Sequence, residues 1–567
     1  MSVADHSKGF REDYLSYADL TAQLQAWAKA YPHVCNLASL GTTPEGREIW
    51  ILTLGTEPDR LRPAAWVDGN MHAVELAGSS AALAIAEDVL RVHAGEAIAL
   101  PETLLDVLKE ILVYVVPRIS PDGAEAVLTT GRYVRSVPRE ERANREHARW
   151  VAKDLDGDGL ALVMRKQDPA GEYVEAKEMP GLLVPRQIDD VGPFYKVFPE
   201  GVIENWDGST IPDPNFLSDN DPDLNRNFPY HWAPEPDQIG AGRYPLSEIE
   251  SRAIVEFVSA RPAIFTWLNL HTFGGVFIRP HGAKPDSKMD PSDLAFYRQF
   301  EEWATEFTSY PTVSGYEEFT YEPDKPLHGD LSDFAYHQRG AISWVCEIWD
   351  LFERAGLPKK KRFVDRYTQI DRGDMVQIAE WDRDHNEGAV MRPWRPLTHP
   401  QIGEVEVGGI DPRFGMWNPP RRLLPEVCEG LAAVFLRTAI LAPRVSIDDV
   451  EVTSVEGEVR HVQATIRNHG YLPTYVLSSS RSLSWNEPLA LSIETEGCTL
   501  LGEERKTLGH LEGWGRGRWS GAGALYYQRS RGSVSERRVH FTVKGSGVVV
   551  LRATSCRVGE VVRSVEI

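Results

Sequence analysis

The sequence predicts an α/β fold, in which helices cover both faces of a mixed sheet, followed by an all-β domain expected to be a β-sandwich. Apolar, β-rich runs alternate with segments whose apolar residues recur at helical spacing, a pattern typical of a sheet covered on both faces. The last part of the chain holds only short alternating runs separated by turn residues. The 567 residues also exceed what one compact core accommodates, so at least two domains are expected.

The elements of the α/β part are indicated by their local patterns. Residues 17–32 (YADLTAQLQAWAKAYP) space their apolar residues as a helix does. Short apolar runs bounded by turn residues predict strands at residues 48–55 and 64–70. Continuous β-rich runs, of the kind buried on both faces, predict strands at residues 111–119, 263–271 and 341–349. Further helices are predicted at residues 247–260 and 423–441.

Two changes in composition indicate how the chain is organised. Residues 138–223 are irregular and rich in Asp, Pro and Gly, and the region is too long for a simple connection, so we expect a folded insertion or a functional loop system. Ala442-Pro443 then precedes a series of short alternating strands, among them residues 537–545 and 547–555. We therefore predict a catalytic domain at residues 1–442, which includes the insertion, and an all-β accessory domain at residues 443–567.

The charge and the cysteines exclude several classes of protein. A net charge of −22 argues against nucleic acid or an anionic membrane as a partner. No apolar run reaches the roughly 18 residues of a membrane span, and the first residues lack the apolar segment of a secretory signal. Five scattered cysteines without C-x-x-C spacing are typical of reduced thiols, so a cytoplasmic location is expected.

Potential metal ligands follow several of the predicted strands. His72 and Glu75 stand where the strand at 64–70 passes into a helix-like segment, and His271 ends the strand at 263–271. In open α/β sheets, ligands bind outside the carboxyl ends of the strands. Two histidines and one glutamate are typical of catalytic zinc, with a fourth position open to water. Taken alone, H-x-x-E recurs by chance, and Glu347, in an otherwise apolar run, could be a buried ion-pair partner.

Taken in order, these residues resemble the M14 family of zinc carboxypeptidases, which have the carboxypeptidase A-like fold. The resemblance covers about residues 14–441. It rests on YPHVCNLASLGTTPEGREIWILTLG, His72 with Glu75, Pro121-Asp122-Gly123, Asn225-Arg226, His271 and Glu347.

The resemblance implies a role for each of these positions. His72, Glu75 and His271 would bind one zinc ion, and Glu347 would be the general base. Arg135, which follows the Pro-Asp-Gly motif, would stabilise the oxyanion. Val74 stands where the family often has an arginine, so the substrate contact made by that arginine is expected to be absent.

The substrate would be recognised by a second group of residues. Asn225 and Arg226 would bind its free C-terminal carboxylate, since a guanidinium pairs with a carboxylate through two parallel hydrogen bonds. The active-site tyrosine would be Tyr321, with Tyr316 as the alternative, because the surrounding stretch differs in length from the family pattern. Ser332 would lie at the floor of the pocket for the substrate's C-terminal side chain, where it favours a neutral or mixed side-chain preference.

The implied activity is that of a zinc-dependent exopeptidase that hydrolyses the C-terminal bond of peptides with a free carboxylate, through a zinc-bound water and a glutamate base. One alternative is an amidase or deacylase of the same fold that acts on a small acylated amino acid or a cell-wall peptide. Another is a binding module without activity, which the presence of all expected ligands and of the base disfavours.

Two further features leave alternatives open. Asp154, Asp156 and Asp158 resemble the opening of a calcium loop, but the twelfth position is Arg165 rather than glutamate, which favours a solvated turn. Arg132 would either contact the edge of the substrate or form a surface salt bridge.

Overall fold

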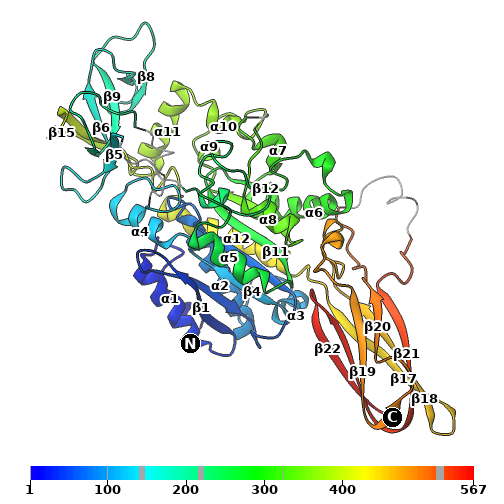
Figure 1. Ribbon diagram of the computed structural model, residues 1–567. Helices are drawn as coiled ribbons and strands as arrows, with labels where there is room; N and C mark the ends of the chain where they lie inside the picture. The colour runs from blue at the N-terminus through cyan, green and yellow to red at the C-terminus, as the bar shows by residue number, and fades with distance from the viewer. Residues whose placement is uncertain are drawn as a thin grey trace.

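An eight-stranded mixed sheet forms the centre of the computed structural model, which describes residues 2–98, 100–139, 147–214, 222–322, 325–518, 526 and 529–567 (Figure 1). The strand order is β1-β2-β4-β3-β11-β14-β12-β13, and the four strands β4, β3, β11 and β14 run parallel to one another. The strands are β1 (Cys35–Thr42), β2 (Glu48–Leu54), β3 (Ala64–Gly69), β4 (Leu112–Val116), β11 (Ile264–Thr272), β12 (Val276–Arg279), β13 (Thr312–Ser314) and β14 (Ile342–Ile348). The predicted mixed sheet is therefore confirmed.

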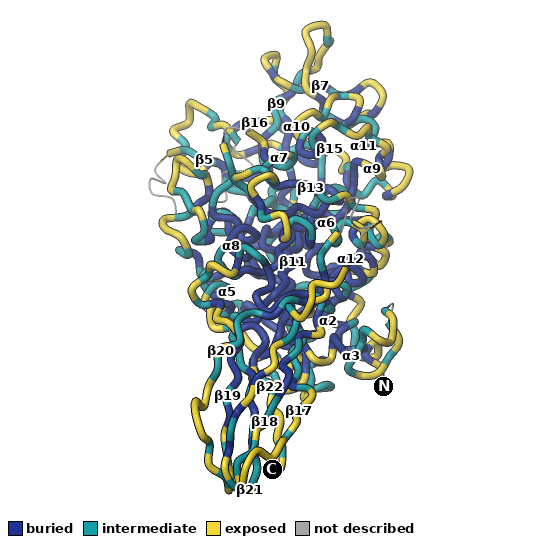
Figure 2. The backbone as a smooth tube through the Cα atoms, turned by 90° about the vertical axis from the view of Figure 1, so that its right-hand side faces the viewer, coloured by how far each residue is buried: buried dark blue, intermediate teal, exposed yellow. Residues whose placement is uncertain are grey.

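Helices cover both faces of this sheet, as the sequence predicts. One face packs against α1 (Tyr17–Ala30), α2 (Ala77–Ala94), α6 (Pro291–Thr308) and α12 (Leu424–Ala439). The other face packs against α5 (Ile249–Ser259) and α8 (Leu331–His337). Because side chains alternate along a strand, Ala65 and Val67 of β3 enter the first core and Trp66 enters the second. Figure 2 shows the resulting burial of β11 at the centre of the molecule.

The remaining helices of the α/β part lie around this sheet. They are α3 (Glu102–Glu110), α4 (Pro121–Thr130), α7 (Gly315–Glu318), α9 (Leu351–Arg354), α10 (Asp365–Thr368) and α11 (Arg372–His385). Among the described helices, none combines the length and the apolar character that crossing a membrane requires.

The region predicted as an insertion contains a second sheet, whose strand order is β15-β16-β6-β9-β7-β8. Residues 140–146 and 215–221 of that region lie outside the described residues. The strands of the insertion are β5 (Arg149–Ala152), β6 (Val163–Gln167), β7 (Tyr173–Glu175), β8 (Leu183–Pro185), β9 (Phe194–Pro199) and β10 (Gly201–Glu204). Of these, β5 and β10 pair with each other in a separate two-stranded sheet. The hairpin of β15 (Met391–His399) and β16 (Gly403–Ile410) completes the second sheet, which the sequence did not predict. Ile402 and Val405 bury their side chains with Met164 and Phe198, so the insertion shares a core with a segment far along the chain.

The C-terminal strands form one continuous antiparallel sheet, which confirms an all-β domain, although the described strands belong to one sheet and not to the two sheets of the predicted sandwich. They are β17 (Val445–Glu456), β18 (Val459–Asn468), β19 (Leu489–Leu500), β20 (Arg505–Gly509), β21 (Glu536–Ser555) and β22 (Gly559–Glu566). The runs 537–545 and 547–555, predicted as two strands, are the single strand β21. The strand continues because Gly547 has no side chain: a Cβ there would lie 2.0 Å from the Glu496 carbonyl oxygen.

One arginine connects the β domain to the central sheet. Arg557, in the turn between β21 and β22, is 1 % exposed and donates hydrogen bonds to the carbonyls of Pro262, Ile264, Arg339 and Gly340. Ile264 begins β11, and Gly340 lies just before β14. The β domain therefore meets the amino ends of these strands, and the seven residue steps from Ile264 to His271 span about 23 Å of extended chain.

Candidate metal centre and substrate cleft

The candidate ligands lie together because three neighbouring strands end at one edge of the sheet. The parallel strands β3, β11 and β14 place His271 directly beside Glu347 in register, while Leu270 pairs with Gly69 at the end of β3. His72 and Glu75 follow β3 immediately, before α2 begins at Ala77. Gly69 permits this short connection, since a Cβ there would lie 2.5 Å from the backbone of Gly78.

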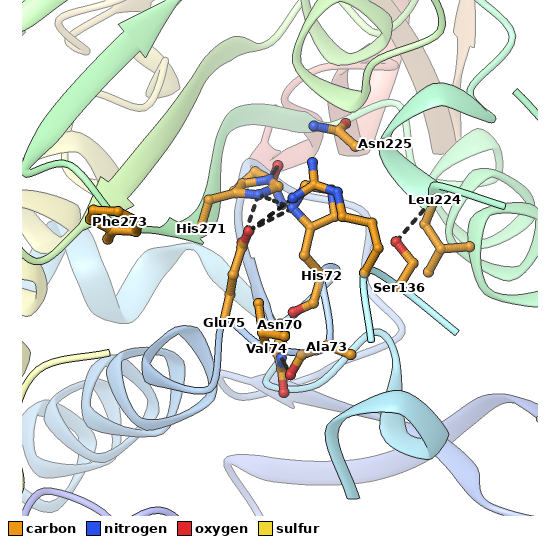
Figure 3. A network of polar contacts seen from close by, with 12 residues as sticks. Asn70, His72, Ala73, Val74, Glu75, Ser136, Leu224, Asn225, His271 and Phe273 are labelled. Carbon is orange, nitrogen blue, oxygen red and sulfur yellow. Dashed lines mark hydrogen bonds and ion pairs between the residues drawn. The ribbon is translucent and has the colours of Figure 1, made fainter. Parts of the chain in front are cut away.

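The three predicted ligands converge on one point (Figure 3). His72 Nδ1 lies 2.8 Å from Glu75 Oε1 and 3.0 Å from His271 Nδ1. His271 Nδ1 also lies 3.0 Å from Glu75 Oε2. All three side chains are buried, so whatever they bind is shielded from bulk water.

The outer nitrogens of both imidazoles face hydrogen-bond acceptors. His72 Nε2 lies 3.1 Å from Asp223 Oδ1, and His271 Nε2 contacts Asn269 Oδ1. Asn269 donates its amide to Asp68, which leaves its oxygen toward the histidine. Because these oxygens accept, they hold the protons on Nε2 and leave both Nδ1 lone pairs directed at each other.

This donor set fits a zinc ion. Burial raises the pKa of Glu75, but the nearby His72 and His271 outweigh that effect and lower it to about 2, so the group is a carboxylate at neutral pH. Two opposed lone pairs 3.0 Å apart beside a carboxylate repel one another unless a cation lies between them. Two imidazole nitrogens and one carboxylate are typical of zinc sites that keep a position open.

Arg135 and Asp223 extend the centre on one side. Arg135 donates Nε to Asp223 Oδ2 at 3.0 Å and a terminal nitrogen to Glu75 Oε1 at 3.4 Å. Burial raises the pKa of Asp223, but Arg135 and His72 hold it well below its usual range. Asp223 also caps the short turn Leu224–Arg226 by accepting from the Asn225 amide at 2.8 Å. The Asp223 carboxylate thus orients the candidate ligand His72, the Arg135 guanidinium and the turn that carries Asn225 and Arg226.

All nine of the predicted site residues line one cleft: His72, Glu75, His271, Glu347, Arg135, Asn225, Arg226, Tyr321 and Ser332. Asn225 is held in place because its Oδ1 accepts from the Leu331 amide at 2.9 Å. Arg226 donates to the Asn225 carbonyl at 2.7 Å, and Ser332 donates its hydroxyl to Asp330 at 2.6 Å. Tyr321 is 52 % exposed, as suits a side chain at the mouth of the cleft.

Two alternatives that the sequence left open concern the choice between Tyr321 and Tyr316 and the role of Arg132. Of the described residues, Tyr321 lines the cleft, whereas Tyr316 and Arg132 are not part of its lining. Burial lowers the pKa of the Arg132 guanidinium, which the negative charge of Glu45 partly offsets.

Glu347 has the electrostatic character of a proton-transfer group. Burial raises its pKa well above the usual range, the negative charge of Glu75 adds to this effect, and Arg135 opposes it. A carboxyl group in such surroundings takes up a proton readily, whereas a surface glutamate would remain ionised.

Two residues of the cleft, and Asp223 beside it, were not singled out by the sequence motifs. Asp223 could have been noticed only as the capping residue of Asp-Leu-Asn-Arg. Tyr367 donates its hydroxyl to the Phe273 carbonyl, and Trp417 reaches the cleft from beyond the β15–β16 hairpin. No local pattern marks either residue, because only the fold brings these segments to the sheet edge.

The aspartate-rich loop does not support the calcium alternative that the sequence left open. Asp154 accepts hydrogen bonds from the amides of Gly157 at 2.7 Å and Gly159 at 2.9 Å, as in a turn. Arg395 of β15 lies 3.3 Å from Asp156 and 3.5 Å from Asp158. The arginine already balances the two carboxylates, so the loop is an aspartate-glycine turn closed by a cation of the chain itself.

Comparison with known families gives two matches along the chain. The model described as zinc carboxypeptidase matches residues 20–171 and 204–368, and a domain of unknown function (DUF8731) matches residues 444–566.

Similar curated proteins include several carboxypeptidases. Carboxypeptidase B of Astacus astacus is 29 % identical over 292 residues, which cover 50 % of this chain and 68 % of that protein. Carboxypeptidase D of Mus musculus is 27 % identical over 152 residues, 26 % of this chain, and the match spans only 10 % of its length. A zinc carboxypeptidase of Saccharothrix mutabilis subsp. capreolus is 25 % identical over 135 residues, covering 24 % of this chain and 29 % of that protein.

Solved structures with a similar arrangement share little sequence. Thrombin-activatable fibrinolysis inhibitor is 14 % identical with a TM-score of 0.42, covering 76 % of this chain and 78 % of that one. A carboxypeptidase A from Helicoverpa armigera is 18 % identical with a TM-score of 0.37, covering 67 % of this chain and 74 % of that one.

We predict that Asp223→Ala weakens zinc binding. The change removes the acceptor of His72 Nε2 and the ionic partner of Arg135, and losing such an outer contact typically costs about 10- to 100-fold in metal affinity. Competition with a chromogenic chelator measures the dissociation constant. Asp207→Ala, in a surface turn, serves as the control and leaves the affinity unchanged. An Asp223→Ala protein that binds zinc as tightly as the unmodified chain would show that this contact has no part in the centre.

Proposed function

Because this chain belongs to the zinc carboxypeptidase family, we propose that it is a zinc-dependent exopeptidase that removes the C-terminal residue of peptides with a free carboxylate. One observation carries this proposal: Arg226 and Asn225 line the same cleft as Glu347 and the His72–Glu75–His271 centre. A group that binds a terminal carboxylate beside a hydrolytic centre restricts cleavage to the last peptide bond.

His72, Glu75 and His271 are the residues that would hold zinc. When bound, zinc supplies a Lewis acid that polarises the scissile carbonyl and makes water more acidic. The Nε2 contacts with Asp223 and Asn269 orient both imidazoles for this role. We assign Asp223 the task of positioning His72.

Glu347 would act as general base and then as general acid. It lies beside His271 at the edge of the sheet, and burial and Glu75 together raise its pKa. A carboxylate with a raised pKa accepts a proton from the attacking water and returns it to the leaving amine.

Arg135 would stabilise the negative charge that develops on the carbonyl oxygen. Its guanidinium is held by Asp223 and reaches toward Glu75, so it is oriented before the substrate arrives. Preorganised donors of this kind cost little reorganisation when charge develops.

Asn225 and Arg226 would bind the terminal carboxylate of the peptide. The Leu331 amide fixes the Asn225 side chain, and the Arg226 guanidinium is anchored on the Asn225 carbonyl. Tyr321, half exposed at the cleft, would close over the substrate.

The pocket for the terminal side chain supports a neutral or mixed preference. Ser332 donates its hydroxyl to Asp330 Oδ1, and that oxygen also accepts from the Asp333 amide at 2.9 Å. The Asp330 carboxylate is therefore engaged within the chain.

We also propose that the chain divides into a catalytic domain at residues 1–442 and an accessory domain at residues 443–567. The two family matches, which end at residue 368 and begin at residue 444, support this division. The Arg557 contacts support a structural role for the accessory domain, since they lie at the amino ends of the strands whose carboxyl ends hold the site.

We predict that Glu347→Gln lowers kcat by about 100-fold or more, because the amide keeps the shape of the side chain but cannot accept a proton. Steady-state kinetics on a short peptide with a free carboxylate measure this loss, and zinc content measured in parallel stays unchanged. Glu426→Gln, whose carboxylate forms an exposed pair with Arg354, is the matched control. A Glu347→Gln enzyme with undiminished turnover would assign the base to another group.

The exopeptidase proposal is tested by removing the substrate's terminal charge. Amidation of the C-terminus should lower kcat/KM by about 100-fold, because the partly buried Arg226 guanidinium loses its bidentate partner. Arg226→Ala should cause a similar loss on free-acid peptides and little further loss on amidated ones, since both changes remove the same contact.

Arg243→Ala provides a control arginine on the same stretch of chain, outside the described lining of the cleft. Equal cleavage of free and amidated peptides by the unmodified enzyme would contradict the proposal and favour the amidase or deacylase alternative.

A further inference from the structure

A second cluster of metal-binding side chains lies next to the substrate cleft. His281 follows β12, while Asp333 and His337 are one turn apart on α8 and so share a face of that helix. One ligand atom from each residue lies within 4.8 Å of the others. None of these residues belongs to the His72–Glu75–His271 centre.

The cluster is held rigidly by its neighbours. His281 Nδ1 lies 2.8 Å from His337 Nε2, and both oxygens of Asp333 accept from the Gly282 amide at 3.1 Å. The His337 ring stacks on Tyr230 with centroids 4.1 Å apart and an interplanar angle of 12°. Rings fixed in this way present their nitrogens without a loss of side-chain entropy on binding.

A simple hydrogen bond between the two histidines does not satisfy this cluster. The side chain of His281 is 4 % exposed, and within the described part of the chain its Nε2 has no hydrogen-bond partner. Burial lowers the pKa of both imidazoles, that of His337 to about 3, so both are neutral at physiological pH. A neutral imidazole is the state that a metal ion requires of a histidine ligand.

The charges around the cluster also favour a cation. Burial raises the pKa of Asp333 well above its usual range, and the neighbouring Asp330 raises it further. Lys284 is the positive charge that acts on Asp333, His281 and His337. A divalent cation bound here would oppose both effects and hold Asp333 as the carboxylate that a metal ligand must be.

We propose that His281, Asp333 and His337 bind a second divalent transition-metal ion, for which zinc is the best match to the two nitrogens and one oxygen offered. The ion joins the loop after β12 to α8. Asp330 and Ser332, at the beginning of α8, line the substrate cleft, so this metal braces one wall of the cleft. The proposal does not depend on the peptidase activity, since it concerns the metal content of the chain.

The experiment separates the two centres by removing the first. His72→Ala/His271→Ala protein is treated with chelator, reconstituted with zinc and desalted, and zinc per chain is measured by inductively coupled plasma mass spectrometry. We expect two zinc ions in the unmodified chain and one in this double variant. Adding Asp333→Asn or His337→Ala to the double variant should remove the remaining ion.

His328→Ala is the matched control for the loss of a histidine at this side of the molecule. His328 contacts the carbonyl of His231 through Nδ1, and its replacement should leave one zinc ion in the double variant. Circular dichroism checks that every variant retains the native secondary structure. Asp333→Asn keeps the acceptor for the Gly282 amide, so this variant tests the metal even if His337→Ala destabilises α8.

Cobalt supplies a second readout. Co²⁺ bound by the double variant should give visible absorption that Asp333→Asn abolishes and His328→Ala preserves. A natively folded double variant that retains neither zinc nor cobalt would overturn the proposal. Retention of the ion after Asp333→Asn and His337→Ala together would overturn it equally.

Discussion

The parallel pairing of β3, β11 and β14 is the constraint on which the rest of the structure depends. It aligns the carboxyl ends of three strands, so that residues far apart in sequence become neighbours: His271 lies beside Glu347, and both lie next to the turn that carries His72 and Glu75. A shift of one residue in this register would turn His271 and Glu347 to opposite faces of the sheet. The two apolar cores, which take alternate side chains from each strand, prevent such a shift.

The alignment of the strand ends brings several charged side chains together in the protein interior, where neighbouring residues of opposite charge or with hydrogen-bonding groups stabilise them. Asp223 and Arg135 form an ion pair that contacts both His72 and Glu75, while Asn269 and Asp68 hold His271. Truncating one member of such a network leaves a buried charge without its partner, which is strongly destabilising. The electrostatic setting of the site is therefore a property of the whole sheet edge and not of the three ligands alone.

The parts that the sequence predicted are those that leave a local signal. Continuous apolar runs indicated β4, β11 and β14, and a polar residue at the end of such a run drew attention to His271 and Glu347. The β15–β16 hairpin was missed because its partner β6 lies in the insertion, more than 200 residues earlier, so no short window of sequence encodes the pairing.

Residues that act through distant partners were missed for the same reason. Asp223 contacts His72 and Arg135 across long separations in the chain. No local pattern links His281 to His337, because they meet only when α8 packs beside the loop after β12. The fusion of two predicted strands into β21 depends likewise on a close approach to β19 at Gly547.

We expect the ends of β3 and β11 to form a zinc centre at this sheet edge. Diffraction from crystals grown with zinc, recorded on both sides of the zinc absorption edge, would locate the ion. We expect an anomalous peak about 2.0–2.2 Å from Nδ1 of His72, Nδ1 of His271 and a carboxylate oxygen of Glu75. Crystals of active, zinc-replete protein without a peak at that position would contradict it.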